Sequence, residues 1–201
     1  MRLKRLLIIF VKNLQYGKVK TRLASDVGND KALEIYRQLI AITERAASQI
    51  NAEKEVWYSD YVAVGDVFDE EAFRKKVQNG ENLGARMANA IREAFENGYE
   101  QVVIIGSDCP DISEALFETA FRNLEKHNAV IGPSKDGGYY LLGLNVYSDM
   151  LFNNISWSTG SVLDETVEKL ESAGLSYVKM PELNDIDTLE DLKKSKLWYG
   201  T

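Results

Sequence analysis

Short apolar runs that alternate with segments of helical periodicity constrain the fold of this chain more than any other feature. The runs "LLIIFV" (residues 6–11) and "QVVII" (101–105) have the length of a strand and no polar alternation, which is typical of strands buried on both faces of a sheet. After the first run the period changes, and apolar residues mark one face of a helix over 30–50. This alternation predicts a layered α/β fold with a mostly parallel sheet, because parallel neighbours need crossover connections.

The rest of the chain continues the alternation. Further strands are expected at 55–59, 129–133, 139–144 and 175–180, and further helices at 69–77, 82–98, 111–127, 159–174 and 187–197. The strands 129–133 and 139–144 are too close in sequence for a helical crossover, so a mixed sheet is expected within a three-layer α/β/α sandwich. Ligands of open α/β sheets bind beyond the carboxyl ends of the strands, which directs attention to the loops after Val11, Ile105 and Ile131.

Bulk composition fits one domain over residues 1–201, because 45% of the residues are hydrophobic, 27% are charged and no Pro/Gly/Ser-rich linker interrupts the chain. The formal net charge of −7 disfavours a nucleic-acid partner. The run "LLIIFV" is far below the roughly 20 apolar residues of a membrane span and precedes no small-residue cleavage site. We therefore expect a cytoplasmic protein without a membrane span. Its oligomeric state stays open, a homodimer included.

The single cysteine and the single histidine offer little chemistry. Because Cys109 is the only cysteine, the chain cannot form an intramolecular disulfide or a thiolate zinc cage. At the end of a strand, Cys109 is expected to be a small buried apolar side chain. His127 lies late in a predicted helix and is expected at the surface. Neither a Ser-His-Asp nor a Cys-His mechanism has support from these positions.

Four cations stand out against the acidic background. Lys12, Lys18, Lys20 and Arg22 fall within eleven residues that contain no acid, between the first strand and the first long helix. Backbone N–H groups favour anions at such a place, and these side chains with Thr21 could bind phosphate oxygens of a nucleotide. The spacing matches neither a Walker A loop nor G-x-G-x-x-G. A solvated basic loop is the alternative, but the position after the first strand favours a phosphate site.

Asp108 in "GSDCPDI" lies immediately beyond the buried strand 101–105. A carboxylate there is a natural hard-oxygen ligand for Mg²⁺ or Mn²⁺ that bridges phosphates. Asp111 has a simpler explanation as the N-cap of the next helix, with Glu114 at capping-box spacing. In "NDIDTLEDL", Asp185 and Asp187 would share one side of an extended segment, and Asp187 could be a second metal ligand or, with Glu190, a helix cap.

Other segments also allow a functional and a structural interpretation. "NLGARM" places Asn82, Gly84 and Arg86 at a helix start, which suits base or phosphate recognition as well as an ordinary turn. Trp157 could stack on a ligand ring or anchor its loop. Each alternative stays open from the sequence.

The stretch "GPSKDGGYYLLGL" connects two predicted strands through a tight turn. Gly137 and Gly138 allow positive φ or close approach of the backbone to a ligand. Asp136 is then either the usual polar residue of a turn or, if Asp108 marks a metal, an acceptor-binding group, a general base or a further metal contact. Tyr139 or Tyr140 would wall the acceptor pocket.

Taken in order, "FVKNLQYGKVKTRLA", "NLGARM", "GSDCPDI", "GPSKDGGYYLLGL" and "DIDTLEDL" resemble a bacterial family of glycosyltransferase-like transferases in the nucleotide-diphospho-sugar transferase (GT-A) superfamily. The resemblance spans nearly the whole chain, and similar architecture occurs in 2-phospholactate guanylyltransferase and molybdenum cofactor guanylyltransferase. It implies a Rossmann-like GT-A fold, a nucleotide over the first loop, and Mg²⁺ or Mn²⁺ held by Asp108 with Asp187. Relatives commonly carry a glycine-rich first loop, whereas here lysines replace the glycines and only "TRL" remains.

Two reactions follow from the resemblance. A nucleotidyltransferase would bind a nucleoside triphosphate, with Lys18, Lys20 and Arg22 stabilising the departing pyrophosphate and Asp108 holding the metal. A glycosyltransferase would bind a nucleotide-sugar, with the metal on the leaving diphosphate and Asp136 near the small-molecule acceptor. The excess positive charge of the first loop favours the triphosphate. A nucleotide-binding protein without turnover is a further alternative, since fold does not establish function.

Overall fold

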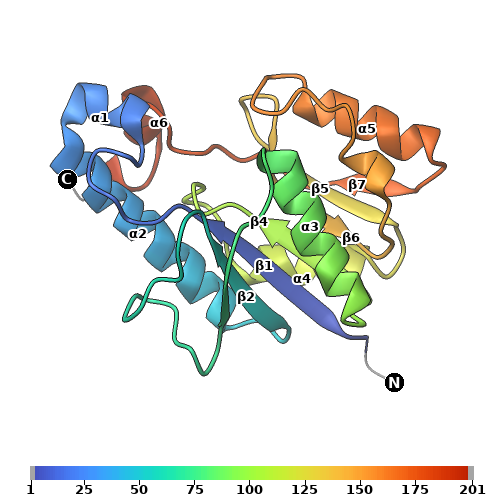
Figure 1. Cartoon of the computed structure of the whole chain (residues 1–201). Coiled ribbons are helices and arrows are strands. Elements are labelled where there is room, and N and C mark those ends of the chain that lie inside the picture. The colour runs from blue at the N-terminus through green and yellow to red at the C-terminus, as the bar shows by residue number, and fades with distance from the viewer. Residues whose placement is uncertain (1–2, 199–201) are drawn as a thin grey trace.

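A seven-stranded sheet with helices on both faces organises residues 3–198, the part of the chain that the computed structural model describes (Figure 1). The strands are β1 (Arg5–Val11), β2 (Glu53–Tyr58), β3 (Arg74–Val77), β4 (Gln101–Ile105), β5 (Ala129–Pro133), β6 (Tyr139–Leu144) and β7 (Tyr177–Lys179), in the order β3-β2-β1-β4-β6-β5-β7. The helices are α1 (Thr21–Val27), α2 (Asn29–Ser48), α3 (Leu83–Glu96), α4 (Glu114–Asn123), α5 (Val162–Ser172) and α6 (Leu189–Lys194), with a 3₁₀ turn at Asp149–Leu151.

The sheet is mixed, as expected. The strands β1, β2, β3 and β4 run parallel, β7 runs parallel to β5, and β6 is antiparallel to both β4 and β5. The short connection between β5 and β6, residues 134–138, cannot return the chain to the opposite end of the sheet, so β6 has to reverse direction. Because β1 and β4 are parallel neighbours, the loops that follow them leave from the same edge.

Two apolar clusters hold the three layers together. Along β1, Leu7 and Ile9 belong to the cluster shared with α2 and α4, whereas Leu6 and Ile8 belong to the cluster shared with α3. These four side chains are fully buried, as the unbroken apolar run predicts. Figure 1 shows α3 crossing one face of the sheet, with α1 and α6 side by side beyond its edge.

The helix expected at 69–77 was a wrong prediction. Residues 74–77 form the edge strand β3, which pairs in parallel with β2, while Phe73 is buried edge-on against Phe68. The charged side chains of β3 have partners on other elements. Lys76 Nζ lies 2.9 Å from the buried Glu55 carboxylate of β2 and 2.7 Å from Glu93 of α3. Tertiary ion pairs therefore override the local pattern.

Helix starts also differ from expectation. The chain forms the short helix α1 before α2, and Ser113 rather than Asp111 caps α4, its side chain accepting a hydrogen bond from the backbone N–H of Leu116. At α6 the capping box consists of Thr188 and Asp191, which leaves the Asp187 carboxylate outside the cap. None of the described helices has the length and apolarity that a bilayer crossing requires.

Candidate active site

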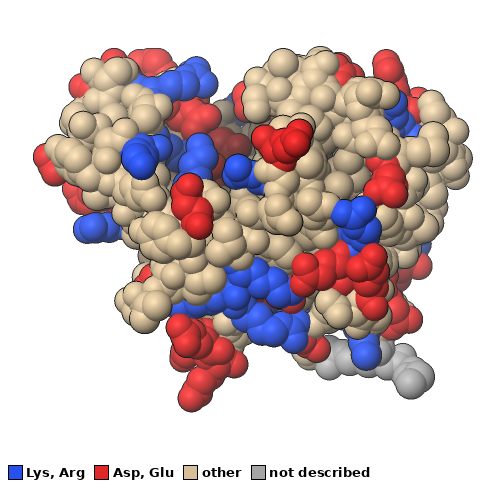
Figure 2. All heavy atoms as spheres, viewed as in Figure 1, with Lys and Arg blue, Asp and Glu red and all other residues tan. Residues whose placement is uncertain are grey.

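A cavity of about 570 Å³ opens at the edge of the sheet where β1 and β4 end. Apolar side chains of the strands and of α3 line one part of it, among them Phe10, Ile104, Leu83 and Met87. Polar side chains line the rest, including Lys12, Arg22, Asp108, Asp136, Asp185 and Asp187. Figure 2 shows basic side chains around a hollow at the top of the view and acidic ones inside it. The predicted loops therefore do converge on one cavity.

The Lys20 ammonium lies between two carboxylates. Its Nζ atom is 2.5 Å from Asp108 Oδ1 and 3.0 Å from Asp187 Oδ1, and the Lys20 side chain is only 4% exposed. The backbone N–H of Ile186 donates to the carbonyl oxygen of Asp108 at 3.0 Å, which fixes the C-terminal segment against the end of β4. Burial lowers the pKa of Lys20, but the charges of Asp108 and Asp187 outweigh burial, so its pKa is raised and the ammonium persists at neutral pH.

The position of Lys20 depends on an unusual backbone conformation and on Tyr36. Lys20 precedes α1 with φ 48° and ψ 43°, a left-handed conformation that non-glycine residues rarely adopt. The Tyr36 ring of α2 lies 5.8 Å from Nζ. The Tyr36 hydroxyl accepts a hydrogen bond from the Lys12 backbone N–H at 2.8 Å and is 3.0 Å from Ser107 Oγ. These contacts join the first loop, α2 and the end of β4.

The other cations of the first loop have no such partners in the described part of the chain. Lys18 and Thr21 line a smaller cavity of about 130 Å³, which shares Lys12, Arg22 and Asp108 with the larger one. Lys12, Lys18 and Arg22 are exposed and make no ion pair within residues 3–198. Three such cations at the rim of a cavity offer charge-assisted hydrogen bonds to an anionic ligand.

Asp185 adds a third carboxylate, which was not among the predicted site residues. Its Oδ1 atom is buried without a hydrogen-bond partner in the described part of the chain. Burial, together with the charges of Asp108, Asp187 and Asp136, raises the pKa of Asp185 to about 7, and Lys20 only partly offsets this effect. The only sequence signal was its alternation with Asp187, which places both residues on one side of an extended segment.

The turn at residues 134–138, here the Asp136 turn, also reaches the cavity. Asp136 Oδ1 accepts hydrogen bonds from Ser134 Oγ at 2.5 Å and from the Gly138 backbone N–H at 3.0 Å. Gly137 has φ +85°, and a Cβ atom built on it would lie 2.1 Å from the carbonyl oxygen of Gly160. The turn therefore accounts for one carboxylate oxygen of Asp136, and Asp136 also lines the large cavity.

The segment 82–86 serves largely to position α3 and the loop before it. Asn82 caps α3 by accepting from the Ala85 backbone N–H at 2.9 Å, and Arg86 donates to the Gly80 carbonyl oxygen at 3.1 Å. Gly84 lies directly beneath Trp157, because a Cβ atom there would be 2.0 Å from the indole Nε1. Trp157 itself lines the large cavity, as do Gly138 and Tyr139, whereas Asn82, Gly84, Arg86 and Gly137 do not.

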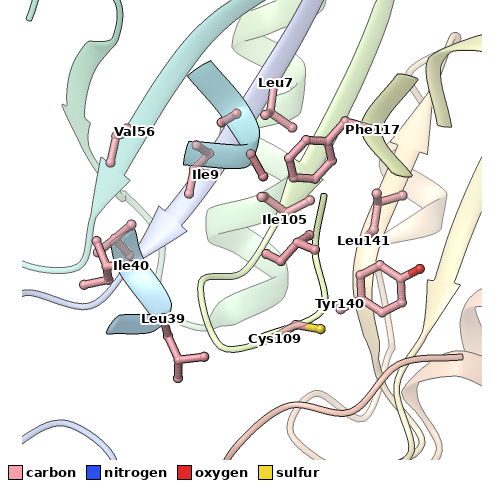
Figure 3. Packing of buried hydrophobic residues seen from close by; sticks show 14 of the residues in the cluster. Leu7, Ile9, Leu39, Ile40, Val56, Ile105, Cys109, Phe117, Tyr140 and Leu141 are labelled. Carbon is pink, nitrogen blue, oxygen red and sulfur yellow. The ribbon is translucent and has the colours of Figure 1, made fainter. Parts of the chain in front are cut away.

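Cys109 is a core side chain, as expected. It is 2% exposed and points into the cluster that contains Ile105 and Tyr140 (Figure 3). Burial raises the pKa of its thiol to about 12. His127 is half-buried beyond the end of α4 and does not line either cavity. The site therefore has to use carboxylates, cations and hydroxyls.

Comparison with known proteins places the chain in a family. The model of the family described as "Uncharacterized protein conserved in bacteria (DUF2064)" matches residues 42–159. The chain belongs to this family. No curated protein matches the sequence.

Solved structures confirm the fold of this DUF2064 protein. A candidate nucleotide-diphospho-sugar transferase from Desulfovibrio desulfuricans G20 is 36% identical, with a TM-score of 0.86 over 95% of this chain and 85% of that one. CMP:2-keto-3-deoxy-manno-octonic acid synthetase complexed with CTP matches at 14% identity, with a TM-score of 0.53 over 98% of each chain. Rv0371c of Mycobacterium tuberculosis H37Rv, in complex with manganese, matches at 12% identity, with a TM-score of 0.55 over 98% and 100%. The last two similarities concern the fold alone, and the expected GT-A type of fold is confirmed.

The residues present in the DUF2064 protein suit a divalent cation that arrives with phosphates. No group of three or more His, Cys, Asp or Glu side chains within residues 3–198 is arranged as a ready metal centre. Mg²⁺ usually binds one or two protein carboxylates and completes its shell with water and substrate phosphates. The Asp108 and Asp187 carboxylates, which converge on one point and are 35% and 45% exposed, match that donor set.

Proposed function

We propose that this DUF2064 protein is a nucleotidyltransferase, which moves a nucleoside monophosphate from a nucleoside triphosphate to a small phosphorylated or acidic acceptor. The observation that supports this most is the position of Lys12, Lys18 and Arg22, which have no acidic partner within residues 3–198, beside the Asp108 carboxylate in one cavity. A triphosphate carries more charge than the diphosphate of a nucleotide-sugar, so it gains more from three cations. The synthetase complexed with CTP has the same fold.

The reaction needs an in-line displacement at the α-phosphorus of the triphosphate. An acceptor oxygen forms the new P–O bond, the bond between the α-phosphorus and the bridging oxygen breaks, and pyrophosphate leaves with the bonding electrons. Lys18 and Arg22 hold the β- and γ-phosphates, and Lys20 stabilises negative charge near the reacting phosphate. Asp136 orients the acceptor and, where the acceptor is a hydroxyl, takes its proton.

A divalent cation completes this site. Asp108 and Asp187 would hold Mg²⁺ or Mn²⁺, which neutralises phosphate charge and orients the donor. The manganese complex of Rv0371c, which has the same fold, supports this assignment.

Glycosyl transfer is the second candidate, because the 36% identical protein is described as a nucleotide-diphospho-sugar transferase. In that reaction a nucleoside diphosphate leaves, and Asp136 lies near the acceptor sugar or alcohol. The two reactions share the donor pocket and differ in the leaving group.

Product analysis separates the candidates. The protein is first screened by thermal unfolding against nucleoside triphosphates and nucleotide-sugars with Mn²⁺, since a ligand at about 100 times its Kd adds about 2.7 kcal/mol of stability. The ligands that stabilise the fold are then incubated with candidate acceptors. Pyrophosphate released from a triphosphate supports our proposal, nucleoside diphosphate released from a nucleotide-sugar supports glycosyl transfer, and stabilisation without any product supports a binding protein.

Replacement of Asp136 by asparagine is expected to lower kcat by about 10²-fold while the affinity for nucleotide changes little. Asparagine Oδ1 can still accept from Ser134 Oγ and the Gly138 N–H, so the turn persists and only the negative charge is lost. Steady-state kinetics and nucleotide titration measure the two effects. Ser134→Ala, which removes one turn hydrogen bond but keeps the Asp136 charge, is the matched control. An Asp136→Asn variant with a lower melting temperature and unchanged kcat would show that Asp136 only builds the turn.

A further inference from the structure

Lys20 occupies the space that a metal ion would need. Its Nζ atom contacts Oδ1 of both Asp108 and Asp187, at 2.5 and 3.0 Å. A small divalent cation binds carboxylate oxygens at roughly 2.1 Å, so the ammonium and the ion cannot both lie between the same two oxygens. Even if the ion used the other carboxylate oxygens, two cations would face each other across a few ångströms in a partly buried site.

The position of the ammonium is also restricted within the described part of the free protein. Lys20 is 9% exposed as a residue, its backbone is held in the left-handed conformation, and the Tyr36 ring covers it. The other cations that line the small cavity, Lys12, Lys18 and Arg22, repel it, and a further carboxylate close by, Asp185, is itself buried. A buried cation that leaves its carboxylates needs a new anionic partner. A bound phosphate group brings such a partner next to these cations.

We propose that Lys20 makes metal binding depend on the nucleotide. Asp108 and Asp187 bind a divalent cation only when a phosphate of the nucleotide binds the Lys20 ammonium and draws it away from the two carboxylates. Lys20 is then a positioning residue as well as a phosphate ligand, because it keeps the two carboxylates together in the free protein. The inference rests on the nucleotide site proposed above but applies equally to a triphosphate and to a nucleotide-sugar. Its consequence is that metal and nucleotide enter together.

Titration of the protein with MnCl₂ in the absence of nucleotide tests this inference, with free Mn²⁺ measured by electron paramagnetic resonance. Lys20→Gln removes the charge but keeps an N–H donor for the carboxylates, and it is expected to bind Mn²⁺ about tenfold more tightly than the wild type. Lys20→Arg keeps the charge and is expected to bind Mn²⁺ as weakly as the wild type. Equal Mn²⁺ affinity of Lys20→Gln and the wild type would overturn the proposal.

Lys18→Gln is the matched control. Lys18 belongs to the same loop and the same small cavity, but it has no carboxylate within ion-pair distance among residues 3–198. The variant is expected to weaken nucleotide binding and to leave the affinity for Mn²⁺ alone unchanged. A tenfold gain in Mn²⁺ affinity in Lys18→Gln as well would mean that general loop charge, not the position of Lys20, controls the metal, and the proposal would fail.

Crystals of the wild-type protein soaked in MnCl₂ give a second measurement if the Lys20→Gln variant does not fold. We expect no anomalous Mn²⁺ peak between Asp108 and Asp187 without nucleotide, and a peak there when nucleotide is added. An ion bound beside an unmoved Lys20, or no ion under either condition, would overturn the proposal. A protein that binds Mn²⁺ as expected but releases no pyrophosphate would refute nucleotidyl transfer alone.

Discussion

Replacement of Asp108 by asparagine is expected to lower turnover by about 10³-fold or more, because the site loses one of the two carboxylates proposed to hold the metal, the one that lies 2.5 Å from Lys20 Nζ. Asp187 already contacts the same ammonium and Asp111 does not line the cavity, so neither is expected to replace it. Release of pyrophosphate, or of nucleoside diphosphate, at saturating Mn²⁺ measures the effect for either candidate reaction.

Loss of fold is not expected to explain that result. The Asp108 side chain is 35% exposed, and Asp187 continues to accept from Lys20, so the variant should lose about 1 kcal/mol of stability. Asp111→Asn is the matched control: it makes the same chemical change three residues away, where Asp111 is exposed and lies 3.5 Å from the Lys196 ammonium. Asp111→Asn should retain wild-type turnover. An Asp108→Asn variant as active as this control would remove Asp108 from the reacting site.

Replacement of Gly137 by alanine is expected to destabilise the protein and to reduce activity together. Alanine at φ +85° costs about 1–2 kcal/mol, and its Cβ atom would lie 2.1 Å from the Gly160 carbonyl oxygen, which adds about 1–3 kcal/mol of overpacking. The contact cannot relax through a rotamer change because the opposing atom is backbone. The Asp136 turn and the segment at 156–163, joined by a hydrogen bond from the Leu163 N–H to the Gly137 carbonyl oxygen at 2.9 Å, must separate.

Gly98→Ala separates the two contributions. Gly98 has φ +81°, but a Cβ atom built at this position would meet no atom of the described chain within 4 Å, and Gly98 follows α3 outside the cavity. This control should show the conformational cost alone and unchanged turnover. Chemical denaturation gives both free energies of unfolding, and steady-state kinetics gives both rates. If Gly137→Ala is as stable and as active as Gly98→Ala, the close packing of the two segments does not persist in solution.

Unbroken apolar runs made most of the sheet predictable. Runs such as 6–11 and 101–105 can only be buried on both faces, and the short spacing between β5 and β6 dictated an antiparallel pair. The edge strand β3 was not predictable, because its charged residues are stabilised by Glu55 and Glu93 from other elements. The helix α1 was missed because Leu23 is the one buried residue among its described positions, which gives no apolar periodicity.

Those residues of the candidate site that directly follow a buried strand were predictable from the sequence. Asp108 and the basic loop follow buried strands, and the structure brings them together in one cavity. Local patterns could not show that Lys20 contacts Asp187, or that Tyr36, which has the pattern of a core residue of α2, reaches the cavity. At the start of α6, a shift of one residue decides between the two predicted roles of Asp187. Because Thr188 caps the helix, the Asp187 carboxylate can contact Lys20.

The ion pair between Lys20 and Asp187 spans 167 residues of sequence. During synthesis the basic loop and most strands leave the ribosome long before Asp187 does, and domains fold as units once their contacts are available. A nascent chain can thus form the centre of the sheet while Lys20 still lacks one of its two carboxylates. The proposed phosphate pocket is therefore complete only after Asp187 has left the ribosome, later than the strands that carry its basic loop and Asp108.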